Sequence, residues 1–156
     1  MPKITPFLWF NDQAEEAANF YCQLFPNSKI NRVTRYLADM PQPEGSVMTV
    51  EFTLDGQEFT ALNGGAVFSF SPAISFVVPC RTQDEVDRFW DALSEGGAIM
   101  PCGWLTDKFG VTWQIVPTVL LEMLQDGDTT KAQNVTRAMM QMEKLDIQKL
   151  QEAYTA

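Results

Sequence analysis

The chain has 156 residues, 46% hydrophobic and 20% charged, a composition typical of one globular domain rather than of a disordered or fibrous protein. Its 11 basic and 20 acidic residues give a net charge of −9, which disfavours binding to nucleic acid and to anionic membranes. No apolar stretch is long enough for a signal peptide or a membrane span, so we expect a cytoplasmic protein.

Histidine is absent, and the three cysteines are Cys22, Cys80 and Cys102. The cysteines form no CxxC pair and are odd in number, so we expect free thiols rather than a disulfide framework. Without histidine the chain lacks the commonest metal ligand and the commonest general base near neutral pH. Any chemistry must therefore use other groups.

The first half of the chain predicts a strand, a helix and three further strands. Residues 3–10 are rich in aromatic and branched side chains, and residues 13–25 place apolar side chains at helical spacing after Asp12, a candidate N-cap. The further strands are predicted over residues 29–37, 46–54 and 58–63. Asp55-Gly56 between the last two is typical of a tight hairpin turn.

The second half repeats this order after a linker at residues 64–72. It predicts a strand over 73–80, a helix over 83–95 with Thr82 as N-cap, and strands over 99–105 and 111–116. Phe20-Tyr21-x-x-Leu24 in the first helix matches Phe89-Trp90-x-x-Leu93 in the second at an offset of 69, which also places Phe7 on Phe76. A shared offset indicates an internal repeat.

The last part of the chain predicts helices over residues 118–125, 129–143 and 146–154. Their apolar stripe contains Ala138, Met139, Met142 and Leu145. A lone surface helix would expose this stripe, so it packs either on its own domain or on a second subunit. We expect a homodimer, the commonest soluble oligomer.

Three segments resemble the PhnB-like family: ITPFLWFNDQAEEAANFYCQLFPNSKI, ALNGG and CGWLTDKFGVTWQIVP. This family, also labelled 3-demethylubiquinone-9 3-methyltransferase-like, belongs to the vicinal-oxygen-chelate (glyoxalase/bleomycin-resistance/dioxygenase) superfamily. The resemblance covers residues 3–150. It implies a single α+β domain in which two βαβββ modules form a half-open, barrel-like mixed sheet around a cavity, followed by C-terminal helices. The modules would span about 3–63 and 73–117, with a helical tail over 118–156.

Superfamily members often hold a divalent metal in that cavity, and the resemblance places the corresponding residues of this chain. They are Pro6, Ala73 or Ser75, a position near Asn63, and Gln114. Proline and alanine have no donor side chain, and serine and amide oxygens are neutral, weak ligands. The sequence therefore predicts no metal and no cofactor.

The resemblance also suggests which side chains would face a ligand. If Gln114 faces the cavity, strand alternation adds a set of apolar and neutral polar contacts. The predicted contacts are Leu8, Phe10, Asn63, Ser75, Trp104, Thr112 and Gln114. Such a lining suits an uncharged aromatic or amphipathic small molecule.

Two residues are candidates for chemistry. Cys102, close to Trp104, is a reactive nucleophile, a contact to a flat ligand or a buried inert thiol. The inert thiol is favoured because no histidine or basic cluster is near it in sequence. Asp107 is a weak catalytic candidate that also suits a turn before Gly110.

Two functions remain: a binding protein for a small aromatic or amphipathic ligand, and an enzyme acting on a quinone-like or other aromatic substrate, including the methyl transfer in the family label. S-adenosylmethionine enzymes of the common type place a glycine-rich turn between a strand and a helix. Asn63-Gly64-Gly65 lacks the third glycine and the helix start. We therefore favour the binding protein and expect no S-adenosylmethionine binding.

Overall fold

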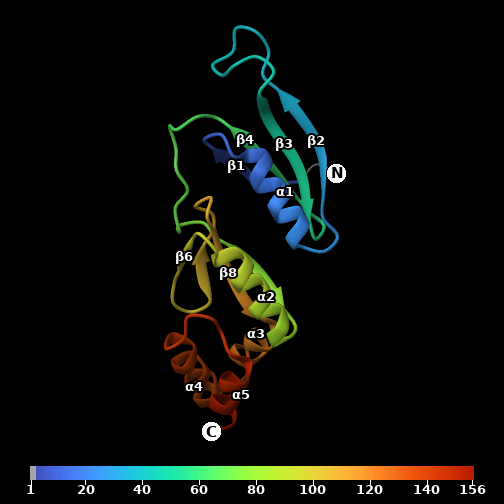
Figure 1. Ribbon diagram of the computed structural model, residues 1–156. Coiled ribbons are helices and arrows are strands. Elements are labelled where there is room, and N and C mark those ends of the chain that lie inside the picture. Colours follow the sequence, from blue (N-terminus) through green and yellow to red (C-terminus); the bar gives the residue numbers. More distant parts are fainter. Residues whose placement is uncertain (1–2) are drawn as a thin grey trace. The chain divides into compact units, whose positions relative to one another are not determined.

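The computed structural model describes residues 3–156, which form two compact units, the first ending at Phe70 and the second running from Ser71 to Ala156. Each unit contains one βαβββ module with an open four-stranded mixed sheet, and the second unit also carries three C-terminal helices (Figure 1). The protein therefore has the predicted α+β fold. Within residues 3–156 no helix is long and apolar enough to cross a membrane.

The first unit has the strand order β1-β4-β3-β2, with β1 parallel to β4 and the other neighbours antiparallel. Its elements are β1 (Phe7–Phe10), α1 (Ala14–Leu24), β2 (Lys29–Arg35), β3 (Val47–Leu54) and β4 (Gln57–Asn63). Asp55 and Gly56 have φ of 46° and 85°, as the predicted hairpin turn requires. Helix α1 packs on one face of the sheet, where the Tyr21 ring lies 6.5 Å from the Phe52 ring.

The second unit repeats the topology with the order β5-β8-β7-β6. Its elements are β5 (Phe76–Cys80), α2 (Gln83–Ser94), β6 (Ala98–Ile99), β7 (Trp104–Thr106) and β8 (Thr112–Pro117). The predicted N-cap Thr82 is confirmed, since its side chain accepts a hydrogen bond from the Glu85 N–H at 3.1 Å. Helix α2 buries an apolar stripe on the same sheet face as Leu105 and Ile115.

Two local predictions were wrong. The strand expected over 99–105 is divided into β6 and β7, because Cys102 and Gly103 have φ of 66° and 83° and turn the chain between them. Asp12 does not cap α1: the N-cap position is Gln13, without a side-chain cap bond, and the Ala14 N–H donates instead to Asn63 Oδ1 at 2.8 Å. A side chain from a distant strand thus performs the capping.

The tail forms α3 (Thr118–Leu124), α4 (Thr129–Met140) and α5 (Ile147–Thr155), which pack together on the second unit. Their core contains Val116, Leu120, Met123, Val135, Leu145 and Leu150. Met139 and Met142 pack against this core, and Leu145 is fully buried in it. The apolar stripe predicted for the tail therefore packs within its own unit, with Leu145 fully buried and the other members partly buried.

Candidate functional site

Four predicted ligand contacts lie on the face of the second sheet opposite α2, and they are Ser75, Trp104, Thr112 and Gln114. We call this surface the Gln114 face. Because Trp113 and Ile115 share the α2 side with Leu105, their neighbours Thr112 and Gln114 point the other way. Gln114 Nε2 donates to Ser75 Oγ at 2.9 Å. Trp104 is the cross-strand neighbour of Gln114. Contact of these residues with a ligand stays a prediction.

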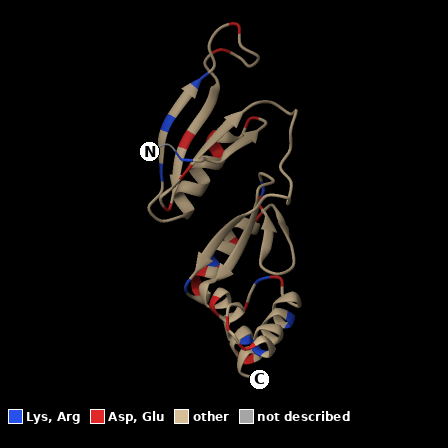
Figure 2. Cartoon of the chain, turned by 180° about the vertical axis from the view of Figure 1, so that it is seen from behind, with Lys and Arg blue, Asp and Glu red and all other residues tan. Residues whose placement is uncertain are grey.

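The Gln114 face is electrically neutral. Strands β5, β6, β7 and β8 read FVVPC, AI, WLT and TWQIVP, without a charged side chain, and Figure 2 shows their ribbons in the neutral colour. The edge strand β2 of the first sheet, by contrast, carries Lys29, Arg32 and Arg35. A neutral sheet has little attraction for an ionised ligand but suits aromatic and amide-bearing molecules.

Thr112 contains an unusual polar group for a buried strand. Its side chain is 1% exposed, and Thr112 Oγ1 has no hydrogen-bond partner among the described residues. An unsatisfied buried hydroxyl costs about 1–3 kcal/mol, so such groups are rare unless another molecule satisfies them. The hydroxyl lies two residues from Gln114 on the same face.

The other three predicted contacts have structural roles in the first unit. Leu8 and Phe10 are 8% and 3% exposed and belong to the buried core, while Asn63 uses both ends of its amide. Asn63 Oδ1 accepts from the Ala14 N–H at 2.8 Å, and Nδ2 donates to the Val47 carbonyl at 3.1 Å. In β1, Leu8 and Phe10 point toward α1, whereas the sequence placed them on the ligand side. We therefore leave Leu8, Phe10 and Asn63 out of the site.

The residue that this alternation presents on the other side of β1 is Trp9, which the sequence reasoning missed. Its Nε1–H donates to the Gly65 carbonyl at 2.9 Å, and its ring meets Phe68 edge-on at 4.9 Å. A Cβ added to Gly64 would lie 2.3 Å from the indole. The paired glycines of ALNGG thus hold Trp9 and do not open a helix. The sequence signal for this contact was the pair of glycines directly after β4, since β1 and its aromatic residues were expected in the same sheet.

Asp107 is a buried structural carboxylate, 3% exposed. Its Oδ1 accepts from the backbone N–H groups of Phe109 and Val111 at 2.9 and 3.0 Å, and Oδ2 accepts from Trp113 Nε1 at 2.9 Å. Both oxygens therefore hold the turn between β7 and β8. This placement agrees with the turn role that its position before Gly110 suggested.

The three cysteines are free thiols in different surroundings. Burial, assisted by Glu85 and opposed by Arg88, raises the pKa of Cys80 to about 12, and burial also raises the pKa of Cys22. Cys102 is half-buried, and its backbone N–H donates to the Met142 carbonyl at 2.8 Å. Strand β7 separates Cys102 from Asp107, so the two candidates for chemistry lie at opposite ends of that strand.

The positions at which the superfamily binds metal do not fit a divalent ion in this chain. Ser75 and Gln114 supply only neutral oxygens and already bond to each other, and the Asn63 amide is used in packing. Over residues 3–156 no group of three His, Cys, Asp or Glu side chains could hold a metal ion. Tightly held transition metals need charged or imidazole ligands in larger number.

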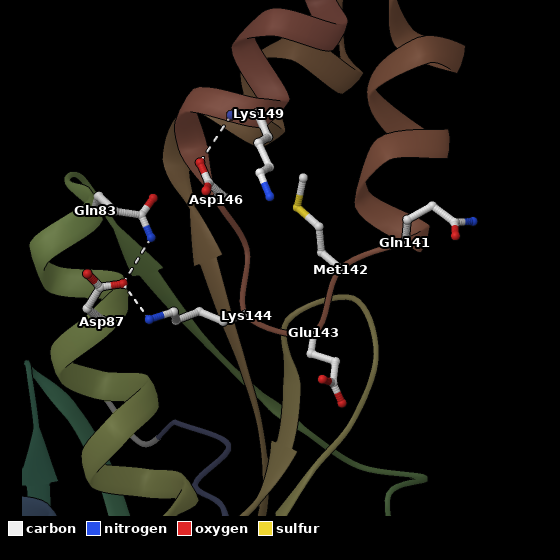
Figure 3. Close-up of a pocket in the computed structure, with 8 residues that line it drawn as sticks. All are labelled: Gln83, Asp87, Gln141, Met142, Glu143, Lys144, Asp146 and Lys149. Carbon is white, nitrogen blue, oxygen red and sulfur yellow. Dashed lines mark hydrogen bonds and ion pairs between the residues drawn. The ribbon is translucent and has the colours of Figure 1, made fainter.

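A separate open pocket of about 480 Å³ lies where α2 meets the segment between α4 and α5 (Figure 3). Its lining residues are Gln83, Asp87, Gln141, Met142, Glu143, Lys144, Asp146 and Lys149. The Lys144 ammonium and the Asp87 carboxylate form an ion pair at 3.0 Å on its wall. None of the predicted site residues lines this pocket.

Comparisons with known proteins agree with the fold. The family model described as 3-demethylubiquinone-9 3-methyltransferase matches residues 2–116. The PhnB protein from Bacillus cereus, which bears the same family name, is 41% identical over 75% of this chain and 100% of its own, with a TM-score of 0.69.

Two more distant structures show the fold alone. Protein PA1353 from Pseudomonas aeruginosa is 22% identical over 75% of this chain and 98% of its own, with a TM-score of 0.62. The fosfomycin resistance protein FosX from Mesorhizobium loti is 14% identical over 80% of this chain and 98% of its own, with a TM-score of 0.56. No curated protein matches the chain. Because the family model matches residues 2–116 and the PhnB protein is 41% identical, the chain belongs to the PhnB-like family of the vicinal-oxygen-chelate superfamily, which is also labelled 3-demethylubiquinone-9 3-methyltransferase-like.

Proposed function

We propose that this protein binds a small aromatic or amphipathic molecule on the Gln114 face without a metal ion. The observation that carries the proposal is the hydrogen bond of 2.9 Å between Gln114 Nε2 and Ser75 Oγ, beside Trp104 on an uncharged sheet. The indole offers a flat apolar surface, and the amide and hydroxyl groups offer weak, neutral hydrogen bonds. Thr112 Oγ1 supplies one further unsatisfied group.

The proposal predicts that methyl 4-hydroxybenzoate, an uncharged aromatic probe, binds the dialysed protein equally well with and without EDTA. Gln114→Ala should weaken binding by about tenfold, because the proposal assigns to this amide one hydrogen bond to the probe, worth about 1.4 kcal/mol. Isothermal titration calorimetry measures both effects. Gln57→Ala, which removes an exposed amide in the first unit, is the matched control and should bind as the wild type does.

Thr112→Val should change protein stability and probe binding in opposite directions, and urea unfolding and calorimetry measure the two effects. It should raise the free energy of unfolding by about 1 kcal/mol, since it removes an unsatisfied buried hydroxyl. It should also weaken probe binding. Loss of binding in EDTA, or about one equivalent of Zn, Ni, Fe or Mn after dialysis, would contradict the metal-independent function.

We also propose that the protein is a cytoplasmic homodimer. The support comes from the edge strands β1 and β5, where Phe7 and Val77 are 60% and 52% exposed, rather than from the tail. Strands at the edge of a sheet that carry exposed apolar side chains favour pairing with another chain. Sedimentation equilibrium should return about twice 17.6 kDa, and a mass of 17.6 kDa at micromolar concentration would contradict the dimer.

A further inference from the structure

The tail is the part of the chain that the family model does not cover, because that model ends at residue 116. Strand β8 ends at Pro117, and α3 begins at the next residue. The tail is nevertheless fixed to the module at three places, which are β8, the turn between β6 and β7, and α2. Such an attachment indicates an integral part of the second unit.

Two of these attachments are polar. The N–H groups of Cys102 and Gly103 donate to the carbonyls of Met142 and Glu143, each at 2.8 Å. Gln83 on α2 donates through Nε2 to the Leu145 carbonyl at 3.0 Å and accepts from the Ile147 N–H at 2.8 Å. Figure 3 shows Gln83 beside the segment that carries Lys144 and Asp146.

The third attachment lies on the Gln114 face. Val116 follows Gln114 by two residues, so both side chains point to the side opposite α2. Gln114 is half-buried, but Val116 is 7% exposed and belongs to the core of the tail. Residues two apart on a strand are separated by about 7 Å. The apolar core of the tail therefore begins at Val116, about 7 Å along β8 from Gln114.

We propose that the tail is a specificity element that closes one end of the Gln114 face and limits the length of the bound molecule. This inference rests on the proposed function, and it narrows the ligand class to compact aromatic molecules without a long substituent toward Val116. Helix α3 supplies the wall, since it contacts β8 and buries Leu120 beside Val116 in the same core. Helix α5 packs instead on α3 and α4.

The methyl, butyl and heptyl esters of 4-hydroxybenzoate test the wall by calorimetry. Without a wall, each buried methylene improves affinity about fourfold. In the wild type we expect the heptyl ester to bind no more tightly than the butyl ester. Leu120→Ala should improve heptyl binding by about tenfold relative to methyl binding. Leu150→Ala removes the same volume from the same core in α5 and should not change the order of affinities.

The outcomes separate the two proposals. Steadily rising affinity from methyl to heptyl in the wild type, identical in Leu120→Ala, would overturn the wall and leave the proposed function standing. If no ester binds any of the proteins, both proposals fail. Circular dichroism checks folding, and if Leu120→Ala does not fold, Leu120→Val and the wild-type length series decide the question.

Discussion

Replacing Asp107 with alanine should lower the free energy of unfolding by at least about 3 kcal/mol. The substitution leaves three buried donors without their acceptor: the N–H groups of Phe109 and Val111, and the indole N–H of Trp113. Each buried donor without a partner costs about 1–3 kcal/mol. Urea unfolding followed by circular dichroism measures the change.

Two variants complete this experiment. Asp107→Asn keeps one carbonyl oxygen as an acceptor and should lose about half as much stability. Asp91→Ala removes an exposed carboxylate from α2 and should stay within about 0.5 kcal/mol of the wild type. A loss below about 1 kcal/mol for Asp107→Ala would show that the turn does not depend on the carboxylate. Unchanged probe binding by folded Asp107→Asn would agree with a structural role.

The elements were predictable because their signals are local. Helix α2 follows from an apolar stripe and the Thr82 cap, and the β3–β4 hairpin follows from Asp55-Gly56. The division of the expected strand at 99–105 was not predictable from alternation, since Cys102 adopts a φ of 66° that non-glycine residues rarely take. The N–H groups of Cys102 and Gly103 donate to the carbonyls of Met142 and Glu143, which lie about 40 residues further along the chain in the tail.

The main error in the predicted site was the sheet face assigned to the side chains of β1, Leu8 and Phe10. The helices repeat at an offset of 69, from Ala14 to Gln83, but three residues join β1 to α1 and only two join β5 to α2. The helix-facing strand residues Leu8 and Val78 are therefore 70 apart, and Phe7 corresponds to Val77 rather than to Phe76. A difference of one residue exchanges the two faces of a strand. Gln114 escaped this error because it was placed from the glycine turn of the second module. Ser75 was placed from Pro6 by the offset of 69, so the reversed facing of β1 and the shift of one residue cancel at this position.

The largest effect in the first unit should come from Gly64→Ala, which places a Cβ where the Trp9 indole now lies, 2.3 Å from two ring carbons. The ring must move, and it then loses its hydrogen bond to the Gly65 carbonyl and its edge contact with Phe68. Overpacking of this kind costs about 1–3 kcal/mol, and we expect the upper part of that range. Gly127→Ala is the matched control, because nothing lies within 4 Å of its added Cβ.

A double-mutant cycle shows whether the cost comes from the indole. In a Trp9→Ala background the alanine at position 64 has room, so Gly64→Ala should cost less than about 1 kcal/mol there. Urea unfolding of the four proteins gives the coupling energy between the two positions. An equal cost of Gly64→Ala in both backgrounds would place the strain in the backbone instead. A large coupling would show that position 64 must be glycine because the Trp9 indole occupies the space that a Cβ would take.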